Sequence, residues 1–370
     1  MKKKRAALVG CGRIGFLLED DPLRYSPCTH YGGALSAGFE ISAACDIDPN
    51  RLELFSRRAG LSADKCYTNH IDLFEKEKPD LVIIATWTGS HAEIGMAAAQ
   101  NGAGVIICEK PLSPSLKTAR LFIDTCRKHG TRLVVNHERR YEPRYRKVRD
   151  MIAGGVIGEV KTVWASMLSP GRRGPSRLED GGGPLLHDGT HLIDAVRFLF
   201  GDIKSVQGEF QRESRKKGFE DRATAWLGTA SGPDVFLEAG GSRDYFVFEL
   251  IISGTGGKIV IGNGCQELFL PRKSRHYTGF KDLAPAGFPR AGGPNCFTAL
   301  YREAGQLLNN PTLPPVSAGE DGYRALEAVH AVYLSAASGR KRIELPLNPA
   351  KIKLAKIGPF LTTKSSFFCE

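Results

Sequence analysis

A glycine-rich turn near the start of the chain is the feature that most constrains the fold. In "AALVGCGRIG", residues 6–15, an apolar run is followed directly by Gly10, Gly12 and Gly15 in the spacing G-x-G-x-x-G. Gly10 permits a tight turn, Gly12 lets the backbone approach a pyrophosphate, and Gly15 allows a helix to pack closely on a strand. With Arg13 and Ile14 between them, these residues predict a dinucleotide site at the N-terminus of a helix that opens there. The alternative is a glycine-rich turn that holds no ligand.

A carboxylate at the end of the second predicted strand refines this prediction. Asp46 ends "ISAACD" and is placed to bind ribose hydroxyls. It would repel a 2′-phosphate, and the next arginine is Arg51, so NAD is favoured over NADP. The spacing from Gly15 to Asp46 is 31 residues, which is longer than the usual separation of about 20. We interpret residues 19–33 as an insertion near the cofactor.

Short apolar runs alternate with helical patterns over the first 136 residues. Continuous apolar strands with helices between them are typical of a parallel sheet that is covered on both faces. We therefore predict an α/β Rossmann domain with a doubly wound parallel sheet over residues 1–136. The predicted strands are residues 6–10, 41–46, 81–86, 104–109 and 132–136.

The pattern changes after residue 158, where strand-like segments follow one another with few helices. This order predicts an α+β domain with a large, mostly antiparallel open sheet, covering residues 137–370. Only residues 188–200 and about 320–338 look clearly helical. Residues 271–295 look like a long irregular loop. Because "YFVFELII", residues 245–252, is apolar on both faces, we expect a homodimer or homotetramer formed by sheet packing.

Charge and cysteine content limit the classes of partner. The net charge of +11 suits an anionic cofactor or substrate, but no basic stripe interleaved with aromatic residues is present, so nucleic acid is not expected. The nine cysteines include no C-x-x-C pair, which indicates a reducing compartment such as the cytoplasm, without disulfides or a metal site. No apolar run approaches the roughly 18 residues that span a membrane, so no membrane partner is expected.

A lysine follows the fourth predicted strand in "CEKPL", residues 108–112. A side chain at the carboxyl end of a parallel strand points toward the crevice where ligands bind. There Lys110 would donate a hydrogen bond to a substrate hydroxyl and stabilise the alkoxide that forms as hydride leaves. The alternative is a solvated surface lysine.

The ordered set of motifs resembles the Gfo/Idh/MocA oxidoreductases over roughly residues 5–346. The segment "GYRALEAVHAVYLSAASGRKRIELP" looks like the closing helix and strand of that family. The motifs that carry the resemblance are "VGCGRIG", "ATWTGSHAEI", "CEKPL", "NHERRYEPRY", "GGVIGEV" and "GGGPLLHDGTHLID".

This resemblance implies hydride transfer between a nicotinamide and a hydroxyl-bearing carbon of a sugar, cyclitol or related polyol. It implies that Lys110 and His191 are catalytic and bind substrate, with His191 as the general acid or base. It also implies a cis Lys110–Pro111 bond, as in some relatives. The residues it places beside the cofactor are Thr86, His91, Glu109 and Lys110.

One position departs from the family pattern. The aspartate expected four residues before His191 is replaced by His187, and Asp188 follows it. Positions i and i+4 share a helix face, so His187 is expected to face the site as a catalytic and substrate-binding residue. Asp188 is expected to be turned aside by about 100°, and Asp194 to contact or orient His191.

Without a carboxylate between them, these histidines and Lys110 disfavour one another's charged forms. This predicts a neutral His187 and a pKa of Lys110 that is lower than usual. The alternative is that His187 caps the helix or packs beneath it.

Arginines precede this motif in "SPGRRGPSRLEDGGG", residues 169–183. Guanidinium groups suit carboxylates and phosphates, so Arg172 and Arg173 are candidate substrate-binding residues. They predict an anionic substrate such as a uronic acid, a phosphorylated sugar or a nucleotide sugar. The alternative is that they are exposed loop arginines.

Three functions are consistent with these patterns. The first is an NAD-dependent dehydrogenase. The second is an NAD-dependent glycoside hydrolase, which oxidises and then re-reduces the sugar without net NADH production. The third is a non-catalytic NAD-binding regulator, which the presence of both Lys110 and His191 disfavours.

Overall fold

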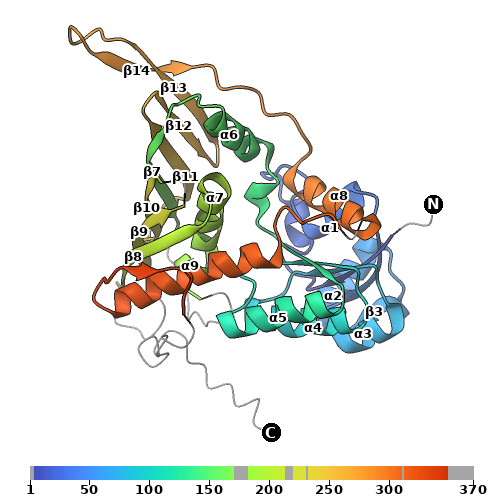
Figure 1. The fold of residues 1–370 in the computed structure, drawn as a ribbon. Coiled ribbons are helices and arrows are strands. Elements are labelled where there is room, and N and C mark those ends of the chain that lie inside the picture. Colours follow the sequence, from blue (N-terminus) through green and yellow to red (C-terminus); the bar gives the residue numbers. More distant parts are fainter. Residues whose placement is uncertain (1–3, 171–181, 213–219, 231, 311, 349–370) are drawn as a thin grey trace. The chain divides into compact units, whose positions relative to one another are not determined.

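The computed structural model describes residues 4–170, 182–212, 220–230, 232–310 and 312–348 (Figure 1). They form two compact units. The first unit contains the chain up to Pro143 together with Gly293–Tyr323, and the second contains Arg144–Gly292 and the chain from Arg324. The sequence-based division placed residues 293–323 with the second domain, whereas in the structure this segment returns to the first unit.

The first unit contains a six-stranded parallel sheet in the order β3-β2-β1-β4-β5-β6. This confirms the predicted doubly wound sheet, whose ligand crevice lies where the order reverses, between β1 and β4. Five strands match predicted runs, whereas β3 is too short to show a pattern. The strands are β1 (Arg5–Val9), β2 (Glu40–Cys45), β3 (Cys66–Tyr67), β4 (Leu81–Ile84), β5 (Val105–Cys108) and β6 (Arg132–Val135).

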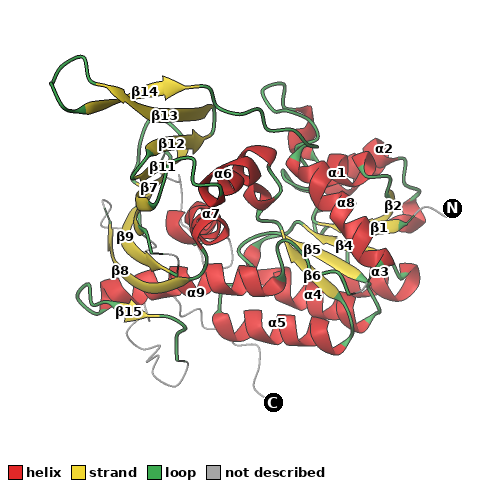
Figure 2. Ribbon diagram, turned by 45° about the horizontal axis from the view of Figure 1, so that its top comes forward, coloured by secondary structure: helices red, strands yellow, loops and turns green. Residues whose placement is uncertain are grey.

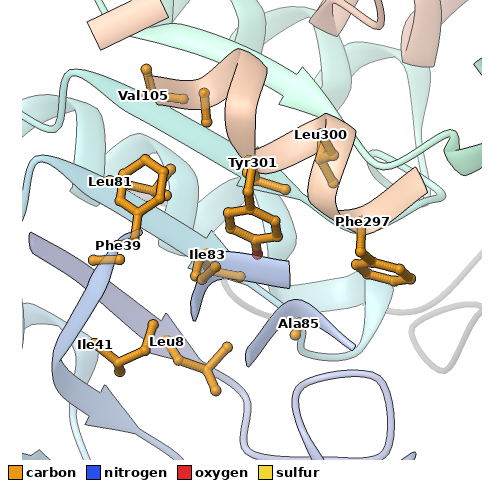
Figure 3. Close-up of a cluster of buried hydrophobic side chains, with 14 of the residues drawn as sticks. Leu8, Phe39, Ile41, Leu81, Ile83, Ala85, Val105, Phe297, Leu300 and Tyr301 are labelled. Atoms are coloured by element: carbon orange, nitrogen blue, oxygen red, sulfur yellow. The ribbon is translucent and has the colours of Figure 1, made fainter. Parts of the chain in front are cut away.

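Helices cover both faces of this sheet (Figure 2). On one face lie α1 (His30–Ser36), α2 (Pro49–Ala59) and α8 (Cys296–Asn309). The other helices of the unit are α3 (His70–Glu77), α4 (His91–Gln100) and α5 (Leu116–Lys128). Helix α8 contributes Phe297, Leu300 and Tyr301 to a buried cluster with Leu8 of β1 and Ile83 of β4 (Figure 3). Residues 293–323 therefore complete the hydrophobic core of the first unit.

The helix predicted to open at the glycine motif is split. One turn forms, with the N–H of Leu18 bonded to the carbonyl of Arg13, and the chain then leaves the helical path. Helix α1 resumes that path, because the N–H of His30 donates to the carbonyl of Ile14 at 3.0 Å. Residues 30 and 14 are sixteen positions apart instead of the four of an α-helix, so twelve residues are inserted. Without them Gly15 and Asp46 would be 19 positions apart, close to the usual spacing of about 20.

The second unit contains a nine-stranded sheet in the order β14-β13-β12-β11-β7-β10-β9-β8-β15. Only β10 and β7 pair in parallel, so the predicted mostly antiparallel sheet is confirmed. The strands are β7 (Val160–Leu168), β8 (Ile203–Gln211), β9 (Arg222–Thr229), β10 (Asp234–Gly240), β11 (Val247–Gly254), β12 (Gly257–Gly262), β13 (Cys265–Lys273), β14 (Lys281–Ala286) and β15 (Ile343–Glu344).

The prediction of an irregular loop over residues 271–295 is wrong in its first half. Strands β13 and β14 form an antiparallel hairpin that extends from the edge of the sheet (Figure 1). Pro271 and Pro285 interrupt the strand pattern of the sequence. Proline is tolerated here because Pro285 lies in the edge strand β14, and Pro271 lies beyond residues 265–269, the part of β13 that pairs with β12.

The described helices of this unit are α6 (Pro143–Ala153), α7 (Thr190–Phe200) and most of α9 (Gly319–Ala337). Helix α7 is almost entirely buried, and a π-helical turn, Leu185–Gly189, precedes it. On the outer face of the sheet, Trp164, Phe236 and Trp226 stack with centroid separations of 4.7 and 5.7 Å. We call these three residues the aromatic row. Within the described ranges no helix has the length and apolar character needed to cross a membrane.

Candidate active site

The glycine loop, residues 10–15, shows why glycine is needed at two of its positions. Gly10 has φ +98°, and a Cβ there would lie 2.6 Å from the carbonyl carbon of Ala85 after β4. A Cβ on Gly15 would overlap the carbonyl oxygen of Gly10. A Cβ on Gly12, in contrast, would meet no atom within 4 Å, so the space beside it is open. The loop therefore fits a pyrophosphate that approaches at Gly12.

Asp46 lies directly after β2 and is 7% exposed. Its Oδ2 accepts a hydrogen bond of 2.7 Å from the N–H of Cys11, and its Oδ1 accepts one of 2.9 Å from the N–H of Asp48. An ionised carboxylate has about four acceptor positions, so two remain for a ligand. Asp46 thus fixes the glycine loop and keeps acceptor capacity for ribose hydroxyls. The guanidinium of Arg51 pairs with Asp48 at 3.3 Å.

The loop after β4 contains Thr86 and His91. His91 is 1% exposed, and its ring nitrogens lie 2.9 Å from the carbonyl oxygen of Pro111 and 3.1 Å from that of Thr86. Burial lowers the pKa of His91 and outweighs the opposing effect of these carbonyls. A neutral ring has one N–H, so it donates to one of these two carbonyl oxygens while it lies between the loop after β4 and the turn after β5. His91 thereby helps to position the turn after β5. Trp87, in the same loop as Thr86, is 57% exposed.

Glu109 and Lys110 follow β5, and the Lys110–Pro111 bond is cis, as expected. Oε1 of Glu109 accepts hydrogen bonds from Nε2 of His30 at 2.9 Å and from Nδ2 of Asn136 at 2.6 Å, and Oε2 accepts from the N–H of Lys110 at 3.2 Å. Nδ1 of His30 lies 2.8 Å from the hydroxyl of Tyr301. We call these side chains, Tyr301, His30, Glu109 and Asn136, the Glu109 network.

This network keeps Glu109 ionised. Burial alone would raise the pKa of Glu109, but the hydrogen bond and charge of His30, together with Lys110 and Asn136, lower it to about 2. Since its oxygens are used inside the unit, Glu109 supports the turn that carries Lys110. Sequence reasoning missed His30, because the twelve inserted residues separate it from the glycine motif. Nothing in the local sequence pattern links Tyr301 or Asn136 to this turn.

The segment "GGGPLLHDGTHLID", residues 181–194, contains the π-helical turn Leu185–Gly189 and the start of α7. Nδ1 of His187 lies 2.9 Å from Oδ1 of Asp188, and both side chains are about one-third exposed. The premise that no carboxylate accompanies the histidines is therefore wrong for His187, whereas the expectation that Asp188 is turned aside from the site stays a prediction. The π-helical turn changes the angular spacing before α7, which an α-helical i, i+4 argument does not capture. His191 is 9% exposed, and the carboxylate of Asp194 lies 3.6 Å from the guanidinium of Arg197.

The structure groups the predicted residues by unit. In the first unit, the loops after β1, β4 and β5 lie at the carboxyl edge of three adjacent strands. Those loops contain the predicted cofactor residues Gly10, Gly12, Arg13, Ile14, Gly15, Thr86, His91, Glu109 and Lys110. The second unit contains His187 and His191. Arg172 and Arg173 lie outside the described residues.

Comparison with known proteins gives the family. Residues 4–137 match the oxidoreductase family with an NAD-binding Rossmann fold, and residues 145–260 match the GFO/IDH/MocA C-terminal domain. The chain belongs to the Gfo/Idh/MocA oxidoreductases. It is therefore an oxidoreductase of this family with an NAD-binding Rossmann domain.

Relatives of this Gfo/Idh/MocA protein include D-apiose dehydrogenase of Paraburkholderia graminis, which is 28% identical over 92% of this chain and 89% of the relative. Inositol 2-dehydrogenase of Ralstonia nicotianae is also 28% identical, over 93% of this chain and 97% of the relative.

Solved structures share the fold. Aldose-aldose oxidoreductase from Caulobacter crescentus, complexed with glycerol, has a TM-score of 0.78 at 20% identity and covers 93% of this chain and 100% of its own. The WlbA dehydrogenase from Bordetella pertussis, in complex with NADH and UDP-GlcNAcA, has a TM-score of 0.74 at 22% identity, covering 94% and 100%.

Proposed function

We propose that this protein transfers a hydride between NAD and a hydroxyl-bearing carbon of a sugar, cyclitol or sugar derivative. The single observation that carries the proposal is the arrangement around the β1–β4 crevice. One unit combines three features: an open space over Gly12, the carboxylate of Asp46 with acceptor positions left for a ligand, and Lys110 after β5. The dehydrogenase relatives, which the chain matches over nearly its whole length, support this assignment.

The residues have distinct roles in this proposal. The glycine loop and Asp46 hold the dinucleotide, whose nicotinamide supplies the hydride acceptor. Lys110 donates a hydrogen bond to the substrate hydroxyl and stabilises the developing alkoxide. His191 takes the hydroxyl proton, and His187, paired with Asp188, binds a neighbouring substrate hydroxyl. His91 and the Glu109 network position the turn of Lys110.

NAD is proposed over NADP on the basis of Asp46. Its carboxylate would lie near a 2′-phosphate and repel it, and Arg51 is engaged with Asp48.

The proposal that the substrate is anionic rests on Arg172 and Arg173. It predicts that Arg172→Ala and Arg173→Ala raise KM for a uronic acid more than KM for a neutral polyol.

The test is a panel of polyols, aldoses and uronic acids with NAD, followed by NADH absorbance. Steady NADH production with one of them is expected, and Lys110→Ala and His191→Ala are expected to lower kcat/KM by at least about 100-fold each. Quenching of Trp87 fluorescence by NADH, compared with a Trp87→Phe control, reports dinucleotide binding separately. Sugar cleavage without net NADH would contradict the proposal and favour the hydrolase.

We also propose that a second copy of this chain covers the aromatic row. Trp164 is 54% and Trp226 47% exposed, and the row borders a hollow of about 320 Å³ on the outer face of the sheet. Exposed aromatic groups of this kind are rare on monomers. A homodimer or homotetramer formed through this sheet face would remove the row from water.

A further inference from the structure

A buried carboxyl group contacts the start of the histidine-bearing segment in the second unit. Glu220 is 2% exposed and lies just before β9. Its Oε1 accepts a hydrogen bond of 2.9 Å from the N–H of Leu185, the first residue of the π-helical turn. The hydroxyl of Tyr333, on α9, donates to both of its oxygens at 3.1 and 3.2 Å. Glu220 therefore connects β9, α9 and the segment that continues into His187 and His191.

The sequence around this contact is adapted to it. A Cβ on Gly183 would overlap the carboxyl group of Glu220, so only glycine lets the chain pass this close. Gly240, with φ +86°, similarly admits the ring of Pro184, because a Cβ there would lie 2.6 Å from its Cγ. Gly183 and Pro184, which end the run "GGGP" before the histidines, are explained by these two close approaches to Glu220 and Gly240.

We propose that Glu220 is the positioning residue that holds the N-terminal end of the segment carrying His187 and His191. The first N–H groups of a helix lack partners within the helix, so an acceptor from outside fixes where the segment begins. Releasing Leu185 from Glu220 would free the π-helical turn and change the position of both histidines. This inference rests on the proposed function only for its consequence in catalysis.

The charge of Glu220 gives the contact a pH dependence. Burial raises the pKa of Glu220 to about 7, although Leu185, its own N–H, Tyr333 and the charge of Arg212 act in the opposite direction. If the segment opens and water reaches the carboxyl group, its pKa returns toward the ordinary 4.5. Protonation therefore favours the closed segment, and a rise of pH through about 7 favours opening.

Hydrogen–deuterium exchange of the free protein tests this without any substrate. After correction for the intrinsic exchange rate, exchange of amides 185–191 is expected to rise about tenfold or more between pH 5.5 and pH 8.5. Glu220→Gln, a neutral mimic of the protonated acid, should stay protected at all pH values. Glu220→Ala should exchange fast at all pH values. Exchange in Glu220→Ala equal to that of the unmodified protein at pH 5.5, where the unmodified protein is expected to be protected, would overturn the proposal.

Two further variants keep the test decisive if Glu220→Ala does not fold. Gly183→Ala should expose the same amides, because its Cβ displaces the carboxyl group. Tyr333→Phe removes a hydrogen bond that favours the charged form of Glu220, so the pH at which exchange of amides 185–191 rises should move upward.

Glu327→Ala is the matched control. Glu327 is also 2% exposed and accepts a backbone N–H, that of Leu347 at 3.0 Å. This control should leave exchange of amides 185–191 unchanged.

Activity then links the contact to the histidines. With NAD and the substrate found in the panel, Glu220→Ala should lower kcat about tenfold with an unchanged KM for NAD, and Glu220→Gln should restore it. If exchange behaves as expected but no polyol yields NADH, the proposed function fails and the role of Glu220 stands. A Glu220→Gln kcat as low as that of Glu220→Ala would contradict the positioning role.

Discussion

Asp46 has a dual role at the scale of a single residue. One of its oxygens fixes the N–H of Cys11 in the glycine loop, and the carboxylate keeps acceptor positions for a ligand. Its charge and its hydrogen-bonding capacity are therefore separable by substitution. Asn keeps an acceptor for Cys11 but carries no charge, whereas Ala removes both.

We predict that Asp46→Asn raises KM for NAD about tenfold and lowers KM for NADP, because the repulsion of a 2′-phosphate is lost while the loop is kept. Asp46→Ala should weaken both cofactors, since Cys11 then loses its partner. Initial rates with each cofactor measure the ratio. An unchanged NAD-to-NADP ratio in Asp46→Asn would show that Asp46 does not select the cofactor.

Glu109 provides a prediction about stability and pH. Its pKa is about 2 in the folded state and 4.5 ordinarily, so folding favours the ionised form. The stabilisation is present above pH 4.5 and is lost as the pH falls toward 2, and its size is about 3 kcal/mol. In Glu109→Gln the free energy of unfolding should be lower at pH 7 and should change less between pH 5 and pH 3.

Urea denaturation at several pH values measures this difference. Glu77→Gln is the control, because Glu77 is also buried in the first unit, where it bonds Lys65 and Tyr67 outside the Glu109 network. A Glu109→Gln variant with the acid dependence of the unmodified protein would refute the assignment.

At the scale of elements, the split first helix shows that an insertion can interrupt the chain of a helix and still preserve its hydrogen-bond pattern. The hydrogen bonds from His30 to Ile14 and from Tyr31 to Gly15 replace those of a continuous helix. Thr29 begins α1 by accepting from the N–H of Gly32 at 3.2 Å. The inserted residues also add an ion pair of Asp20 with Arg58, which is largely solvent-exposed.

We predict that deletion of residues 17–28 yields a folded protein that still binds NADH. The twelve-residue deletion brings His30 four positions after Ile14, in α-helical register. The exposed Asp20–Arg58 pair that is lost contributes little to stability. Thermal unfolding and Trp87 quenching measure the outcome. Deletion of residues 17–27, one residue fewer, is the control and should destabilise α1. Equal behaviour of the two deletions would contradict the register.

The sequence predicted strands better than it predicted the site. Apolar runs locate β1, β2, β4, β5 and β6, because a parallel strand buried on both faces needs continuous apolar residues. The place of helix α8 was missed because a local sequence pattern does not show which unit a helix packs against. The Glu109 network and Glu220 were missed because a buried charge gives no local periodicity. The π-helical turn at His187 likewise follows from packing.

At the scale of the whole molecule, the aromatic row predicts assembly. Phe236 lies between Trp164 and Trp226 in register, so a lysine there would place a charge in the middle of the proposed interface. We expect Phe236→Lys to shift the protein to a monomer in gel filtration with light scattering. Leu54→Lys is the control, because Leu54 on α2 is 51% exposed, similar to Trp164 and Trp226. A monomeric unmodified protein, or an unchanged oligomer in Phe236→Lys, would exclude this interface.

The return of residues 293–323 to the first unit has a consequence for biosynthesis. Phe297, Leu300 and Tyr301 of α8 fill the core beside β1 and β4, so that core is incomplete until the ribosome has passed residue 309. Translation proceeds at about 5–20 residues per second, so roughly ten seconds or more pass between synthesis of the N-terminal strands and synthesis of α8. During this interval their apolar face is open to chaperones, and strands β7 to β14 of the second sheet are synthesised before α8 completes the first core.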